Sequence, residues 1–162
     1  MIIINNSNYL KYKTLKFRCG IGKAGIGIKK TEGDNITPKG TYKIVKIYYR
    51  KDRIKNIVSK FKLFEIKKNM GWCDDPNSRF YNKLISLPKK DHHEKLYRSD
   101  NIYDVLVVLN YNMDPIIKGK GSAIFIHIAK KQFEPTAGCV ALNKADLLFL
   151  LATIEKNTEI KI

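Results

Sequence analysis

Three short runs rich in β-branched and aromatic residues constrain the fold of this chain more than any other feature. They cover residues 41–49, 102–111 and 123–128. Such side chains favour extended backbone. The run 123–128 is almost entirely apolar, which is typical of a central strand. The alternation within 41–49 slips between Ile44 and Val45, which permits either a bulge or burial on both faces.

The remaining segments fit the same class. Residues 1–5, 14–22 and 159–162 are predicted as further short strands. Only the stretch of roughly 144–155 has leucines at helical spacing, and Asn143 precedes it as a candidate N-cap. The pattern predicts a mainly β fold, a β-sandwich or open barrel with about one C-terminal helix, rather than a doubly wound sheet.

One long segment has no strong periodicity. Residues 50–80 are charged and irregular, and they are predicted to be a surface excursion with a short helix around 54–65. No repeat or low-complexity linker divides the chain. A length of 162 residues fits a single domain, so residues 1–162 are expected to form one.

Composition narrows the class of partner. The chain has 31 Lys and Arg against 15 Asp and Glu, a net charge of +16. The excess is scattered and no nucleic-acid-binding motif is present, so no nucleic acid is expected as a partner. A positive surface would still help to capture an acidic polymer.

Nothing in the sequence predicts a membrane span or an export signal. No apolar run reaches the ~18 residues that a spanning helix needs, and the first residues lack a basic region and a cleavage site. We therefore expect a cytoplasmic protein if Met1 is the native start, and a periplasmic or cell-wall protein if a leader has been removed. The three cysteines, Cys19, Cys73 and Cys139, are odd in number and form no CxxC pair, which argues against a disulfide framework.

The richest chemical signal lies between residues 122 and 142. His127 closes the apolar run, and Cys139 follows within Thr136-Ala-Gly-Cys139. A thiol becomes a good nucleophile once a base removes its proton, and histidine is the usual base. Gly138 lets the backbone turn sharply, so that the amides of Gly138 and Cys139 are candidates for an oxyanion hole. A backbone carbonyl is expected to orient the imidazole, because no acidic third member is evident. The plain alternative is a buried structural cysteine near a core histidine.

These residues resemble the L,D-transpeptidase catalytic domain (YkuD) family, whose motif is a histidine, a variable flap and then Ser/Thr-x-Gly-Cys. Further elements that resemble it cover most of the chain: Thr37-Pro-Lys-Gly40, Gly71-Trp-Cys-Asp-Asp-Pro76, Tyr81-Asn82, His93-Glu94, Tyr103-Asp104 and Gly121-Ser-Ala-Ile-Phe-Ile-His127. The element with Gly71 to Pro76 resembles a compact bacterial subgroup. The sequence departs from the family at Ala137 and Ala141, where many members have polar residues.

The resemblance implies a β-rich sandwich-like fold, with no metal and no organic cofactor. It implies that Cys139 attacks the L,D bond of peptidoglycan tetrapeptide stems and releases D-alanine, with His127 as general base. An amine then accepts the acyl group, which gives a cross-link or exchange, or water does, which gives an L,D-carboxypeptidase acting on soluble muropeptides. The expected state is a monomer. A rival of another class is a non-catalytic module that binds wall polymer or nucleic acid.

Several other residues are candidates for substrate binding. Thr136 and Ala137 flank the cysteine, and a polar-aromatic cluster comprises Trp72, Asp74, Tyr81 and Asn82. His93 is a further candidate. Three of these candidates also have a structural interpretation. The Thr136 hydroxyl would stabilise a turn, the polar-aromatic cluster would be a hydrogen-bonded loop anchored by a buried tryptophan, and His93 would form a surface pair with Glu94. A zinc site of His93, His127 and Cys139 has no supporting ligand spacing.

Overall fold

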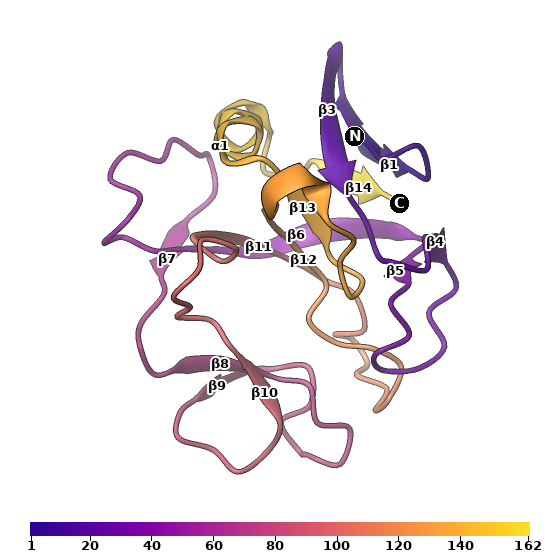
Figure 1. Ribbon diagram of the computed structural model, residues 1–162, viewed down its shortest axis with the longest axis vertical. Coiled ribbons are helices and arrows are strands. Elements are labelled where there is room, and N and C mark those ends of the chain that lie inside the picture. Colours follow the sequence, from indigo (N-terminus) through magenta and orange to yellow (C-terminus); the bar gives the residue numbers. More distant parts are fainter.

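The computed structural model describes all residues 1–162, and eight of its strands form a closed, barrel-like ring (Figure 1). Around the ring the order is β11-β12-β13-β3-β2-β1-β14-β6, and β6 pairs back with β11. The strands are β1 (Ile2–Asn5), β2 (Tyr9–Tyr12), β3 (Leu15–Gly20), β6 (Thr41–Tyr49), β11 (Val105–Leu109), β12 (Phe125–Ile128), β13 (Val140–Leu142) and β14 (Glu159–Lys161).

Strand β6 closes the ring because it is long enough to pair at two places. Its first residues, Thr41–Lys43, pair with β14, and the rest pairs with β11. The register slips so that Val108 faces Lys46 while Leu109 faces Ile44. Val45 is therefore the extra residue, and a bulge, one of the two predicted alternatives, is confirmed.

A smaller layer lies beside the ring, in the lower part of Figure 1. It contains the three-stranded sheet β10-β8-β9, made of β8 (Met70–Cys73), β9 (Leu84–Ser86) and β10 (His93–Lys95). Strand β7 (Leu63–Glu65) pairs in parallel with the end of β6, and β4 (Ile26–Gly27) pairs with β5 (Thr37–Pro38).

Two hydrophobic clusters share the central strands. The larger cluster includes Val107 and Ile126, together with the buried face of the helix. The smaller one includes Leu106 and Phe125, and packs them against Trp72. Strands β11 and β12 are buried on both faces for this reason, which explains their nearly continuous apolar sequences.

The single α-helix, α1 (Lys144–Thr153), follows β13 directly. The Asn143 side chain accepts a hydrogen bond from the Asp146 amide at 2.8 Å, so the predicted N-cap is confirmed. A short 3-10 turn, η1 (Lys131–Phe133), lies between β12 and β13. The mainly β class with a barrel-like sheet and one C-terminal helix is confirmed, and the pairing of β6 with β11 makes the barrel closed rather than open. No helix has the length and apolar character needed to cross a membrane.

The prediction of a short helix around 54–65 is wrong. This segment is turn and irregular backbone that ends in β7. Ile54, Ile57 and Phe61 have helix-like spacing, but they pack in and against the barrel core from irregular backbone. The parallel pairing of Leu63–Glu65 with β6 prevails over this local pattern. The surface excursion at 50–80 also contains β8, with Trp72 and Cys73 buried.

Candidate active site

Strands β12 and β13 bring His127 and Cys139 to one face of the barrel wall. The two strands are parallel, and His127 lies opposite Ala141. Cys139 comes two positions before Ala141, so its side chain projects from the same face. That face is turned towards the smaller hydrophobic cluster, against which Cys139 packs.

The loop that carries the cysteine has a fixed shape. Gly138 has φ +138°, and an added Cβ would lie 2.8 Å from the Ile36 carbonyl oxygen, so glycine is required there. The Thr136 hydroxyl donates to the Cys139 carbonyl at 2.6 Å and accepts from the Gly138 amide at 3.1 Å. The Thr136 backbone is in turn tied to Ile21 and Lys23.

These bonds change the predicted oxyanion hole. The Gly138 N–H is already used by Thr136, which leaves only the Cys139 N–H of the two expected donors without an acceptor in the protein. Thr136 thus acts inside the loop, as the structural interpretation of its hydroxyl predicted.

The thiol of Cys139 is half-buried and hydrogen-bonded at rest. Its Sγ donates to the Ala123 carbonyl at 3.1 Å and accepts from the Phe125 amide at 3.4 Å. Burial, reinforced by the Glu94 carboxylate, raises the pKa of Cys139 to about 12. The Phe125 amide acts in the opposite direction, because it is a donor aimed at the sulfur.

The imidazole of His127 is buried and held in one tautomer. Its Nδ1 lies 2.9 Å from the carbonyl oxygen of Ile128. A carbonyl only accepts, so Nδ1 carries the proton and Nε2 presents its lone pair. Burial lowers the pKa of His127 to about 4, so the ring is neutral near pH 7. The predicted orienting carbonyl is therefore that of Ile128.

No hydrogen bond joins the thiol to the imidazole, but both line one cavity of about 210 Å³. The Tyr103 ring stands edge-on to His127, with centroids 5.6 Å apart. Three charged side chains also line this cavity: Arg98, Lys130 and Glu134. The neutral acid and the neutral base thus share a space that is open to a substrate.

Cys139 also lines a second cavity, on the side away from His127. Its walls include Lys29, Asp74, His92, Glu94 and Ser122. Glu94, Ala137 and Cys139 contribute to both cavities. Cys139 therefore borders two cavities.

Glu94 stands between these cavities and accepts a hydrogen bond from the Tyr103 hydroxyl. Burial raises the pKa of both groups. In the second cavity, Asp74 lies 2.6 Å from Nδ1 of His92, and this contact raises the pKa of the histidine. The site thus holds titratable groups on each side of the thiol.

The predicted substrate-binding residues are divided by the fold. Ala137 is exposed and lies in both cavities, and Asp74 lies in the second. His93 does not reach either, because it lines a separate cavity with Lys68, Lys89 and Lys95. Strand alternation explains this, since His92 and Glu94 point to the opposite face of β10 from His93.

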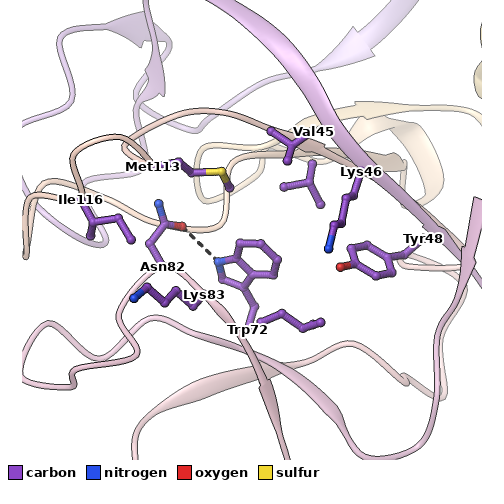
Figure 2. A pocket seen from close by; sticks show the side chains of 10 residues that line it. Val45, Lys46, Tyr48, Trp72, Asn82, Lys83, Met113 and Ile116 are labelled. Atoms are coloured by element: carbon purple, nitrogen blue, oxygen red, sulfur yellow. Dashed lines mark hydrogen bonds between the residues drawn. The ribbon is translucent and has the colours of Figure 1, made fainter. Parts of the chain in front are cut away.

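Trp72, Tyr81 and Asn82 lie outside the two cavities beside Cys139, and all three are buried. The Trp72 Nε1 donates to Asn82 Oδ1 at 3.1 Å, and both residues line a different cavity (Figure 2). Asn82 Oδ1 also accepts a hydrogen bond from the Ala123 amide, and the carbonyl of Ala123 accepts the hydrogen bond from the Cys139 thiol. Tyr81 binds Glu32 and the Gly121 amide. These contacts match the structural interpretation of the cluster.

Sequence reasoning did not single out Tyr103, Arg98, Lys29 or His92 as site residues. They reach the cysteine from loops and strands distant in the chain. Two sequence signals pointed towards them: the Tyr103-Asp104 element, and the His93-Glu94 element, whose strand alternation identifies the inward-facing neighbours. No group of three or more His, Cys, Asp or Glu side chains is placed to hold a metal ion.

Comparison with known proteins agrees with this geometry. A search of curated proteins found no match for the chain. The family model for the L,D-transpeptidase catalytic domain, YkuD, matches residues 1–162. The chain, with its cysteine and histidine on one barrel face, therefore belongs to the L,D-transpeptidase catalytic domain family.

Proposed function

We propose that this protein is a cysteine acyltransferase that cleaves the L,D bond of peptidoglycan tetrapeptide stems and transfers the acyl group to an amine. Cys139 is the nucleophile and His127 is the general base. The observation that carries the proposal is that one cavity holds the thiol together with an imidazole whose Nε2 lone pair is free.

The resting pair is neutral, so the first step moves one proton. The thiol turns from the Ala123 carbonyl towards His127 Nε2 and transfers its proton as the sulfur attacks the substrate carbonyl. The Phe125 amide stabilises the developing thiolate, and the Cys139 N–H is available to the developing oxyanion. The Ile128 carbonyl stabilises the imidazolium that forms.

The second half of the reaction returns the proton. His127 protonates the leaving amine, so that D-alanine departs and a thioester to Cys139 remains. An incoming amine then attacks the thioester, His127 takes its proton, and the thiol is regenerated. Two cavities that meet at Cys139 suit a reaction in which one peptide donates the acyl group and another accepts it.

Water is the alternative acceptor, and it would make the protein an L,D-carboxypeptidase of muropeptides. Incubation with a tetrapeptide muropeptide and a D-amino acid, followed by mass spectrometry, distinguishes the two. We expect exchanged and dimeric products from the wild type and none from Cys139→Ala. Tripeptide alone identifies the carboxypeptidase. Activity that survives in Cys139→Ala, or no activity in either protein, contradicts the proposal.

A further inference from the structure

The cavity beside Trp72 is not part of the acyl-transfer site. It has a volume of about 280 Å³ and seven of its ten lining residues are hydrophobic. Trp72 packs edge-on against Phe125, with centroids 5.2 Å apart, and this pair separates the cavity from the cysteine. Figure 2 shows Trp72 in the middle of the cavity, with Val45, Met113 and Ile116 around it. Such walls suit the apolar part of a small ligand.

A polar end is built on strand β6. Lys46 and Tyr48 are two residues apart, so both side chains leave the same face of the strand. Both residues line the cavity, and both are drawn in Figure 2; the Lys46 ammonium lies over the Phe64 ring, 5.4 Å from its centroid. Tyr48 is only 3% exposed as a residue, but its hydroxyl keeps some contact with solvent and makes no hydrogen bond within the protein. The hydroxyl is therefore available to donate a hydrogen bond to a ligand or to water.

The charge of this end is uncompensated. Neither Lys46 nor Lys83, the second lysine of the cavity, forms a salt bridge, and no acidic residue lines the cavity. Trp72 and Asn82 satisfy each other, so their polar atoms leave the apolar walls intact. The available donors are one hydroxyl and an ammonium on the same strand, and donors of these two kinds suit a carboxylate.

We propose that this cavity binds a small amphipathic carboxylate, with the carboxylate on Lys46 and Tyr48 and the apolar body against Trp72. The site is independent of Cys139, and it requires no chemistry from the acyl-transfer centre.

The chain has one tryptophan, so intrinsic tryptophan fluorescence reports on this cavity alone. Octanoate serves as the probe and octan-1-ol as its uncharged analogue. We expect octanoate to change the fluorescence saturably and octan-1-ol to bind at least several-fold more weakly. Lys46→Met and Tyr48→Phe should each weaken octanoate binding by roughly three- to tenfold, because each removes one contact to the carboxylate.

Lys43→Met is the matched control, since Lys43 lies exposed on the same strand but outside the cavity. It should bind octanoate as the wild type does. Three results would overturn the proposal: no saturable change, equal binding of octanoate and octan-1-ol, or octanoate binding that Lys46→Met and Tyr48→Phe leave unchanged. Titrating Cys139→Ala in parallel separates this test from that of the proposed function, because the cavity should bind equally well in that variant.

Discussion

Two regions of this molecule contain motif-like residues, and the fold uses them differently. The segment 127–139 supplies a base and a thiol to one open cavity. The segment 71–82 supplies Trp72 and Asn82, which form a hydrogen bond with each other, and Trp72 packs in the smaller hydrophobic cluster. Polar atoms in the second segment are paired within the protein, whereas His127 Nε2 and the Cys139 N–H are not. The reactive segment therefore differs from the structural one in having polar groups that border a cavity without a partner in the protein.

The largest contrast should come from Cys139→Ala. Removing the nucleophile should reduce D-alanine release to the level without enzyme, because no thioester can form. The thermal midpoint should change little, since the side chain is only half-buried. D-alanine release by mass spectrometry and a melting curve by circular dichroism measure the two effects. A salt-sensitive affinity for wall polymer as the only activity of both proteins would favour a non-catalytic binding module.

His127→Gln should have the next largest effect. Losing the general base should slow acylation by roughly 10²- to 10⁴-fold. Glutamine keeps most of the volume, so the fold should be retained. A carbapenem should acylate Cys139, because the chain belongs to this family. The single-turnover rate of that acylation is the measurement. An unchanged rate would show that another group takes the thiol proton.

Trp72→Ala tests the structural segment, residues 71–82. It should lower the free energy of unfolding by about 3–5 kcal/mol, because it removes a buried ring that packs on Phe125. Chemical denaturation followed by circular dichroism measures this. The fraction that stays folded should keep a carbapenem acylation rate close to that of the wild type. A large loss of rate with normal stability would instead make Trp72 part of the substrate site.

The pH dependence of alkylation tests the resting state of the pair. The pKa of Cys139 is raised to about 12 and that of His127 is lowered to about 4, both chiefly by burial. The thiolate fraction should therefore rise about tenfold per pH unit through the neutral range, and iodoacetamide alkylation with it. A rate that stays flat across neutral pH would mean a preformed thiolate–imidazolium pair.

Features of the fold that depend on neighbouring residues could be predicted from the sequence. The bulge at Val45, the Asn143 cap and the strands with continuous apolar residues follow from short-range rules, and they are confirmed. Strand β2 and the β8–β10 layer were not predicted. Their strands are short, and pairing between distant segments defines them. The helix at 54–65 was not found because the same apolar side chains pack on the barrel core from irregular backbone, and residues 63–65 pair with β6 instead.

The site shows the same division. His127 and Cys139 lie close in sequence on adjoining strands, so a motif reveals them. Arg98 and Tyr103 come to the cysteine's cavities from the loop between β10 and β11, and His92 comes from the residue just before β10. The direction of the Gly138 amide depends on the Thr136 hydroxyl, which residue types alone do not specify. Contacts made across the fold are therefore the part that the sequence did not reveal.

The most direct test of the central claim is to locate the acyl group. The wild type is incubated with a carbapenem, digested, and each of the three cysteine-containing peptides is analysed by tandem mass spectrometry. The account predicts one adduct, on Cys139, with Cys19 and Cys73 unmodified because both are buried. An adduct on Cys19 or Cys73, or no adduct on a folded protein, would contradict it.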